Sequence, residues 1–208
     1  MKLVVYSDWF RVYENVLSKE YCDKIIKYSE PLMINQPLHG TEKLKEGHPQ
    51  KDWRTSNQCF IDKSQPIINE LDKAASTLTK ISINNFEKTS VIRYKKGQEY
   101  KGHFDFFDEG KQEYYDKAIS FGGNRIATAL FYLRDEFEGG ETRFLRCDNL
   151  TIKPKKGMCI IWQNMIDTRA FGDKIYKPNM ASYHAGLPVK SGEKWIATKW
   201  IRENTCTM

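Results

Sequence analysis

Apolar and polar residues alternate along much of the second half of the chain, with the period of two that half-buried β-strands show. Turn-forming residues such as Gly139, Gly140, Pro154 and Gly192 interrupt this alternation. The pattern predicts strands at 89–94, 125–133, 141–144, 149–152, 158–162, 181–185 and 194–201. We therefore expect a β-rich region that begins near residue 89.

The first half of the chain shows a different spacing, because apolar residues recur every three or four positions in two segments. The first segment follows Ser18, a suitable N-cap, and Pro31 prevents it from continuing. The second runs from 64 to about 78 and carries Pro66 in its first turn. Both segments predict amphipathic helices. Two more strands are predicted at 3–13 and 53–61.

A long polar segment, 31–52, follows the first helix and is rich in Pro, Gly, Lys and Gln. It contains His39 and His48, but neither has a second ligand-type residue at a metal-binding spacing, so we interpret both as loop residues. A loop of this length in a compact domain is often a lid or a binding loop. We therefore expect it to contact a substrate.

Two helices followed by about seven or eight strands are typical of helices packed against a β-sandwich or jelly roll. We predict a β-rich α+β fold in which the N-terminal helices pack on one sheet of a jelly-roll core. The 208 residues, 40% hydrophobic and 29% charged, fit a single domain, 1–208. Within it, 1–88 would provide helical support and the substrate loop, and 89–202 would form the core.

Charge and cysteine content exclude several classes of protein. The formal net charge is +6, but the basic residues are scattered from end to end, which indicates a solvated surface and no nucleic-acid partner. The five cysteines form no C-x-x-C pair, which predicts free thiols in a reducing compartment. The start, MKLVVYSDWF, is too short and too polar for a secretory signal, and no apolar run could span a membrane. We therefore expect a cytoplasmic protein with no membrane partner.

The segment RYKKGQEYKGHFD carries the strongest chemical signal. It places His103 and Asp105 two residues apart, and residues i and i+2 of an extended strand point to the same face. An isolated H-x-D is weak evidence for a metal site. With the distant His184 it becomes a two-histidine, one-carboxylate set, which leaves positions open on iron(II) for substrate and oxygen chemistry.

Lys194 lies ten residues after His184 and opens the last predicted strand. It shares one face of that strand with Ile196, Thr198 and Trp200. If this face points inward, the buried ammonium needs an anionic partner, such as the carboxylate of a cosubstrate. The strand alone favours the alternative, a surface lysine at the start of the strand.

Four other residues are candidates for the site. Arg125 opens the most apolar predicted strand, where it either orients a carboxylate ligand, shapes a substrate cleft or is a strand-edge charge. Thr142 follows a Gly-Gly turn and can donate its hydroxyl to a carboxylate. Tyr94 and Tyr100 flank the H-x-D segment, although buried tyrosines are more often core or rim residues. Residues 106–121 break the strand pattern and are expected to form a mobile loop over the site.

Four segments, in this order, resemble the catalytic domain of prolyl 4-hydroxylases, which are 2-oxoglutarate- and iron(II)-dependent dioxygenases of the double-stranded β-helix fold. They are RYKKGQEYKGHFDFF, NRIATALFYLRDEFEGGETRF, PKKGMCIIWQN and SYHAGLPVKSGEKWIATKW. The resemblance is dense over 89–202 and looser before it. It is to the short, single-domain versions of algae, bacteria and large viruses, because we expect neither the peptide-binding domain nor the secretion signal of the collagen-type animal enzymes in this protein.

The resemblance implies a role for each candidate residue. His103, Asp105 and His184 match the iron(II) ligands. Arg125 and Tyr100 match positions that face the peptide substrate. The implied partner is a proline-containing peptide or protein.

The remaining matches concern the cosubstrate. Lys194 matches the residue that pairs with the distal carboxylate of 2-oxoglutarate, and Tyr94 and Thr142 match positions that hydrogen-bond it. Trp200 matches an aromatic residue that lines the site. The implied reaction hydroxylates peptidyl proline at C4, consuming O2 and 2-oxoglutarate and giving succinate and CO2, with ascorbate as reductant. Two alternatives stay open: a related hydroxylase of lysyl side chains, free amino acids or nucleic-acid bases, and a non-enzymatic jelly-roll binding module.

Overall fold

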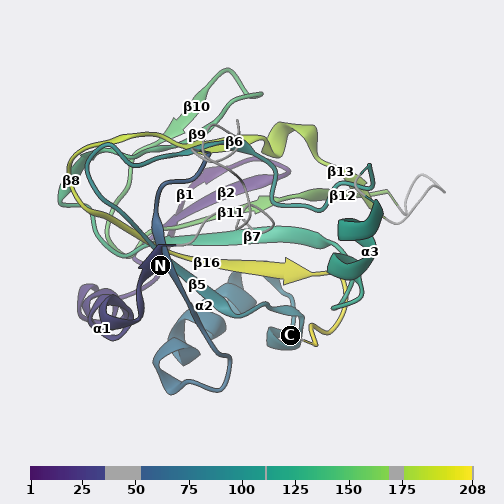
Figure 1. Ribbon diagram of the computed structural model, residues 1–208, viewed down its shortest axis with the longest axis horizontal. Coiled ribbons are helices and arrows are strands. Elements are labelled where there is room, and N and C mark those ends of the chain that lie inside the picture. Colours follow the sequence, from purple (N-terminus) through teal and green to yellow (C-terminus); the bar gives the residue numbers. More distant parts are fainter. Residues whose placement is uncertain (36–52, 111, 169–175, 208) are drawn as a thin grey trace.

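The computed structural model describes residues 1–35, 53–110, 112–168 and 176–207. Two antiparallel sheets form the body of the protein, and Figure 1 shows the smaller sheet on one side of the larger one and helices on the other. In spatial order, the larger sheet contains β1 (Lys2–Tyr6), β2 (Phe10–Glu14), β11 (Cys159–Gln163), β7 (Arg125–Tyr132), β16 (Lys194–Arg202), β5 (Thr89–Tyr94), β4 (Asn57–Ile61) and β3 (Ile34–Asn35). The smaller sheet contains β10 (Leu150–Ile152), β9 (Thr142–Phe144), β14 (His184–Gly186) and β6 (Tyr100–His103). This is the predicted jelly-roll arrangement of facing sheets.

Two short strand pairs and several helices complete the described part of the chain. The strand pairs are β8 (Phe137–Gly139) with β15 (Val189–Gly192), and β12 (Met165–Asp167) with β13 (Tyr176–Pro178). The α-helices are α1 (Lys19–Ser29), α2 (Asn69–Thr79) and α3 (Gln112–Ile119). The 3-10 turns are η1 (Glu30–Leu32), η2 (Pro66–Ile68), η3 (Ile83–Asn85) and η5 (Met180–Ser182).

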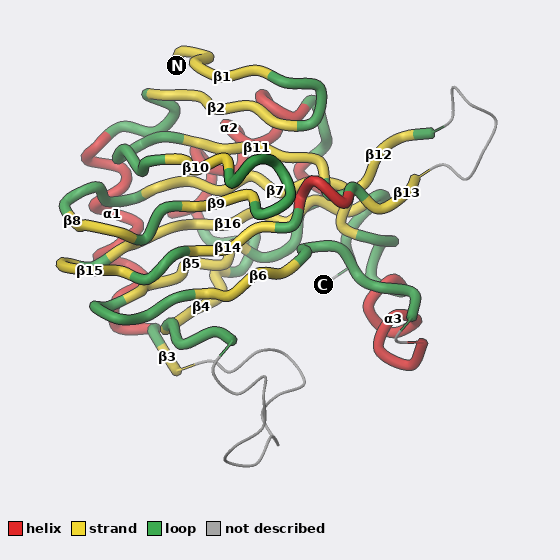
Figure 2. Tube along the Cα trace, turned by 90° about the horizontal axis from the view of Figure 1, so that it is seen from above, coloured by secondary structure: helices red, strands yellow, loops and turns green. Residues whose placement is uncertain are grey.

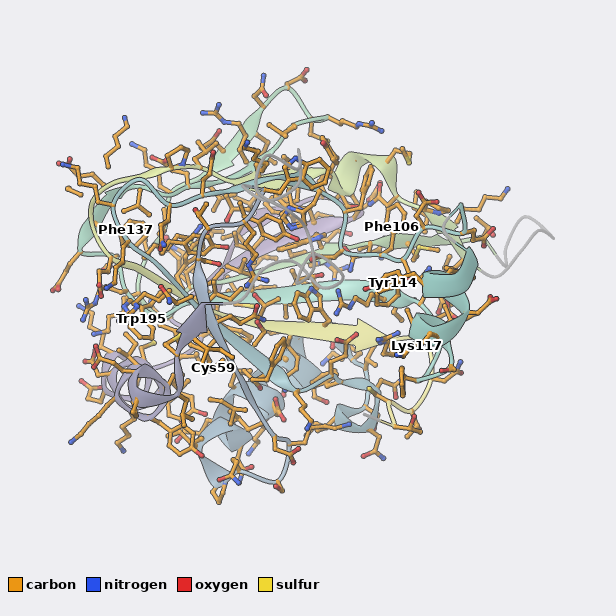
Figure 3. All side chains as sticks on the ribbon, viewed as in Figure 1. Cys59, Phe106, Tyr114, Lys117, Phe137 and Trp195 are labelled. Atoms are coloured by element: carbon orange, nitrogen blue, oxygen red, sulfur yellow. The ribbon has the colours of Figure 1, made fainter. Side chains whose placement is uncertain are left out.

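The larger sheet separates two hydrophobic clusters. One fills the space between this sheet and the helices α1 and α2, and it includes Cys59 and Trp195, which are labelled in Figure 3. The other lies between the two sheets and includes Phe144, Trp162 and Ile196. Because β-strand residues alternate between faces, each central strand contributes side chains to both clusters. The N-terminal helices therefore pack on one sheet, as the sequence predicts.

The helix boundaries follow from local chemistry. Ser18 is confirmed as the N-cap of α1, and its hydroxyl accepts a hydrogen bond from the Tyr21 amide at 3.1 Å. The α-helix ends at Ser29, and Pro31 lies in the 3-10 turn η1 that follows. The second predicted helix begins as the 3-10 turn η2, with Pro66 at its start, and becomes the α-helix α2 only at Asn69.

The structure corrects several strand predictions. The single strand predicted over 3–13 is the hairpin β1–β2, because Ser7 donates from its amide to the Phe10 carbonyl at 2.8 Å and closes a turn. The strand predicted over 181–185 begins only at His184, after the turn η5. Residues 106–121 are not only a loop, since they contain α3. His39 and His48 lie outside the described residues.

The N-terminal part of the chain is more than a helical support. Between residues 1 and 88 it contributes β1, β2, β3 and β4 to the larger sheet as well as α1 and α2. The pairing of β4 with β5 joins this part to the core, with Cys59 opposite Val91. None of the helices in the described residues combines the length and the apolar character that a membrane-spanning helix needs.

A buried ion pair joins α2 to the larger sheet. Lys199 on β16 places its Nζ 2.6 Å from Asp72 Oδ1, and the two side chains are 0% and 6% exposed. Burial lowers the pKa of Lys199 and raises that of Asp72, so desolvation outweighs their attraction and each group is pushed toward its neutral form. The pair therefore adds little stability over two apolar residues, whereas either charge alone would be strongly unfavourable.

We predict that Asp72→Leu lowers the free energy of unfolding by about 3–5 kcal/mol, because it leaves the Lys199 ammonium buried without a counter-charge. The double variant Asp72→Leu/Lys199→Met should recover most of that loss. Urea unfolding of the three proteins, followed by circular dichroism, measures both values. A double variant as unstable as Asp72→Leu would contradict this account of the pair.

Candidate metal centre

The two histidines of the candidate site are brought together by strand pairing. β14 runs antiparallel to β6 in the smaller sheet, and His184 lies directly opposite His103. Their ring centroids are 4.3 Å apart. In Figure 2 both strands lie near the middle of the molecule, in front of the larger sheet. Directly opposed residues point to the same face of a sheet, so both imidazoles face the space between the sheets.

Asp105 joins them from the segment that follows β6. Its Oδ1 lies 3.6 Å from His103 Nε2, and its Oδ2 lies 4.0 Å from His184 Nε2. The three groups each offer one ligand atom, and these atoms lie within 4.8 Å of one another. Asp105 does not belong to the strand, as the i, i+2 argument assumed, because β6 ends at His103. The carboxylate still reaches the same point.

Both histidines are oriented by backbone carbonyls. His103 Nδ1 lies 2.8 Å from the Lys101 carbonyl oxygen, and His184 Nδ1 lies 2.8 Å from the Ser182 carbonyl oxygen. A carbonyl oxygen only accepts, so each Nδ1 carries the proton and each Nε2 presents its lone pair to the site. This is the arrangement in which histidine binds a metal ion.

Protonation states also suit a cation. Burial lowers the pKa of His103 to about 3, assisted by the nearby His184, so its imidazole is neutral at pH 7. Burial acts to raise the pKa of Asp105, but His184, His103, Arg125 and a hydrogen bond from Thr128 together hold it below its usual value. A neutral imidazole and an ionised carboxylate are the forms that ligate metals. The donor set of two imidazole nitrogens and one carboxylate fits iron(II) with open positions.

Lys194 lies inside the same cavity. The side chains of His103, Asp105, His184 and Lys194 all line it. Lys194 is 1% exposed, and within the described part of the chain its ammonium makes no hydrogen bond or ion pair. Burial lowers its pKa to about 7, although Glu141 acts in the opposite direction. The surface-lysine interpretation of this strand is therefore wrong, and the cavity contains a cation that lacks an anionic partner.

The other predicted cosubstrate residues line this cavity too. They are Tyr94, Thr142 and Trp200. The Thr142 hydroxyl accepts a hydrogen bond from the Tyr132 hydroxyl at 2.6 Å, which leaves its own proton free to donate. Burial raises the pKa of Tyr94, so its phenol stays protonated. The Lys194 ammonium lies 5.1 Å from the centre of the Tyr94 ring.

The two predicted substrate-facing residues differ in position. Tyr100 lines the cavity and stacks on His103, with ring centroids 3.5 Å apart and an interplanar angle of 16°. Arg125 is not among the residues that line it. Its guanidinium forms two hydrogen bonds to Glu87, at 2.7 and 2.8 Å, and lies 3.8 Å over the Trp200 ring. A third bond, 3.4 Å long, reaches the Asp105 carbonyl, so Arg125 contacts the ligand segment through its backbone.

Sequence reasoning missed two groups near the site. Thr128 donates to Asp105 Oδ2 at 2.7 Å, and only the inward alternation of its strand gave a signal. Arg54 lies 5.3 Å over the Tyr100 ring and donates to the Ser56 hydroxyl at 2.9 Å. Arg54 comes from the N-terminal part of the chain through an isolated bridge to Tyr100, which no local pattern indicates.

Comparisons with known proteins agree with this geometry. The family model of the 2OG-Fe(II) oxygenase superfamily matches residues 89–202. The chain is 34% identical to prolyl 4-hydroxylase 2 of Arabidopsis thaliana over 91% of its length, and it spans about two-thirds (66%) of that relative. It is 33% identical to a putative prolyl 4-hydroxylase of Acanthamoeba polyphaga mimivirus, covering 92% of this chain and 73% of the other.

A solved structure gives the same result. The viral collagen prolyl hydroxylase of Paramecium bursaria Chlorella virus-1, in its 2-oxoglutarate complex, superposes with a TM-score of 0.69 and 29% identity. The match covers 94% of this chain and 96% of the viral one. The chain therefore belongs to the 2OG-Fe(II) oxygenase superfamily, and the relatives that show this are prolyl 4-hydroxylases.

We predict that His103→Ala, Asp105→Ala and His184→Ala each abolish iron(II) binding, because each removes one ligand from a set of three. Anaerobic titration with iron(II), read by competition with a coloured chelator, measures this. Circular dichroism should show that the metal-free fold persists in all three. His39→Ala, which removes a histidine to which the sequence gives no metal role, serves as the control. Iron binding at wild-type affinity in any of the three variants would rule out this ligand set.

Proposed function

We propose that the protein is an iron(II)- and 2-oxoglutarate-dependent dioxygenase that hydroxylates peptidyl proline at C4. The observation that carries the proposal is the pairing, within one cavity, of a three-ligand metal set and an unpartnered buried lysine. An iron site alone fits many enzymes, but a nearby buried cation suits a cosubstrate that brings a second carboxylate. The choice of proline is supported by the names of the plant and viral relatives.

Each candidate residue has a task toward these groups. His103, Asp105 and His184 would hold iron(II), and Lys194 would neutralise the distal carboxylate of 2-oxoglutarate. When bound, the two supply the oxidation, in which decarboxylation of 2-oxoglutarate to succinate and CO2 accompanies transfer of one oxygen atom of O2 to a C–H bond. Ascorbate would serve as reductant.

The remaining side chains orient and enclose. Tyr94 and Thr142, whose hydroxyls are protonated, would donate hydrogen bonds to the carboxylate beside Lys194. Trp200 would form an apolar wall that keeps water away. Tyr100 would fix the His103 ring and face the peptide, and Arg125 would shape the substrate side through Trp200 and the Asp105 backbone.

We propose a single domain, 1–208, in which 89–202 is the catalytic core and 31–52 contacts the peptide substrate. A reducing compartment, such as the cytoplasm, is supported by the cysteines, all five of which are free thiols.

Mass spectrometry of peptides tests the activity. Proline-rich peptides, lysine-containing peptides, free proline and an alkylated oligonucleotide would be incubated with enzyme, iron(II), ascorbate and 2-oxoglutarate. We expect a gain of one oxygen on proline residues only, together with equimolar succinate. Oxygen transfer to another substrate class, with none to proline, would replace the proposed substrate. Absence of succinate formation with every substrate would contradict the dioxygenase activity itself.

We predict that Lys194→Ala weakens 2-oxoglutarate binding by roughly thirty- to several-thousand-fold. Truncating one partner of a desolvated charge pair costs about 2–5 kcal/mol, and about 1.4 kcal/mol corresponds to tenfold. Iron(II) affinity should change little, because Lys194 is not a ligand. Titration of 2-oxoglutarate at saturating iron gives the first affinity, and anaerobic competition with a coloured chelator gives the second. Unchanged 2-oxoglutarate affinity would show that another cation holds the carboxylate.

Binding of 2-oxoglutarate should also depend on pH. In the free enzyme burial lowers the pKa of Lys194 to about 7, so above that pH the neutral amine must take up a proton before it can pair with the carboxylate. The apparent affinity should therefore be constant below pH 7 and fall by up to about tenfold per pH unit above it. Lys194→Arg keeps its charge and should bind with no such decline. If the wild-type protein and Lys194→Arg showed the same decline, protonation of Lys194 would not be its cause.

A further inference from the structure

The carboxylate ligand is held by a chain of buried side chains. Thr128 Oγ1 donates to Asp105 Oδ2 at 2.7 Å, and Asn164 Nδ2 donates to Thr128 Oγ1 at 2.8 Å. Thr128 and Asn164 are both 0% exposed. The direction is fixed, because the carboxylate only accepts and the single hydroxyl proton must go to it. The Thr128 oxygen can then only accept from Asn164. The side-chain amide of Asn164 therefore orients the Thr128 hydroxyl so that its proton points to Asp105.

A second chain of hydrogen bonds holds His184, the histidine ligand from β14. Its Nδ1 donates to the Ser182 carbonyl, which lies at the end of the 3-10 turn η5. Asn179 is the N-cap of that turn, and its Oδ1 accepts from the Ala181 amide at 3.1 Å. The Asn179 carbonyl also accepts the Ser182 hydroxyl at 2.7 Å. The position of the carbonyl that orients His184 therefore depends on Asn179.

The two chains meet at the base of the hairpin formed by β12 and β13. The backbone amide of Asn179 donates to the backbone carbonyl of Asn164 at 2.9 Å. The side-chain Nδ2 of Asn179 donates to the backbone carbonyl of Gln163 at 2.8 Å. In Figure 2 these two strands extend outward from the body of the molecule, beyond the ends of the main sheets. The hairpin thus starts from a pair of buried asparagines, each of which leads to a different metal ligand.

We propose that Asn164 and Asn179, together with Thr128, form one positioning network that fixes Asp105 and His184 relative to each other for metal binding. None of the three touches the metal position, so they act through the ligands. The inference rests on the metal centre and is independent of which substrate is hydroxylated. Outer hydrogen-bond partners of metal ligands typically affect metal affinity by about 10–100-fold.

The side-chain oxygen of Asn164 indicates that this residue does not serve the stability of the fold. Its Oδ1 is buried and has no hydrogen-bond partner among the described residues. A buried unpaired carbonyl is unfavourable for folding. An apolar residue would fill the position without this cost, but it could not donate to Thr128. The need to direct the Thr128 hydroxyl toward Asp105 accounts for an asparagine at this place.

Substitutions on the Asp105 side test the first chain. Thr128→Val keeps the shape and removes the hydroxyl, and Thr128→Ser restores it. The matched control is Thr89→Val, which makes the same change at a threonine in the same sheet that is also 0% exposed and whose hydroxyl has no hydrogen-bond partner among the described residues. Iron(II) affinity is measured by anaerobic chelator competition, and the thermal midpoint of each metal-free protein is recorded.

We expect Thr128→Val to lose about 10–100-fold in iron(II) affinity, with Thr128→Ser and Thr89→Val close to wild type. Asn164→Asp should weaken iron(II) binding as well, because a second carboxylate would compete for the Thr128 proton. The visible charge-transfer absorption band of the protein with iron(II) and 2-oxoglutarate, recorded anaerobically, should shift in the variants that lose iron(II) affinity. A Thr128→Val protein within about twofold of wild-type affinity would overturn the proposal.

A double-variant cycle tests whether the two chains are one network. Asn179→Ala removes the cap of η5 and the hydrogen bond from Asn179 Nδ2 to the Gln163 carbonyl, next to Asn164. The position of Asn164 should then be less well fixed, so Thr128→Val should cause a smaller further loss of iron(II) affinity in this background. The combined loss of iron(II) affinity should be smaller than the product of the single losses by a factor greater than about two. Losses that simply multiply would show two independent supports and refute the single network.

Discussion

The antiparallel pairing of β6 with β14 is the constraint on which the site depends. It places His184 opposite His103, although the two residues come from distant parts of the sequence. A slip of one residue would turn every side chain of β14 to the other face. Tyr183 or Ala185 would then enter the cavity and His184 would leave it. No adjustment of side-chain rotamers could restore the ligand set, so the metal centre is as well defined as this register.

Packing on both faces of the smaller sheet holds that register. On the inner face, the His184 ring contacts Trp162 and Phe144, with centroids 4.7 and 5.9 Å away. On the outer face, Tyr183 lies close over Gly102, where an added Cβ would come within 2.7 Å of the tyrosine hydroxyl. Glycine at this position lets the tyrosine ring cover the strand next to His103. The same residues that pack the sheets therefore also align the ligands.

How far the sequence predicts this protein depends on the range of the interaction involved. The strand Thr89–Tyr94 is correct to the residue, because its boundaries follow from local alternation and turn residues. The short strand β6 is not among the predicted strands, since Lys101 and Gly102 give it no apolar pattern and its partner is remote. Thr128 could be placed on an inward face, but its bond to Asp105 depends on how the two sheets face each other. The candidate ligands were found from residue types, and their supports required the tertiary structure.

Two buried lysines on β16 show how function can be separated from packing. Lys194 and Lys199 are both nearly inaccessible, and burial lowers the pKa of each. Lys199 faces the helices, where Asp72 lies 2.6 Å away and supplies the counter-charge within the protein. Lys194 faces the cavity between the sheets, where no described group pairs with it. A folded chain tolerates a buried ammonium without a partner only at a cost, and selection for stability alone would have removed it. The lysine that lacks an internal partner is therefore the one that we propose binds an external anion.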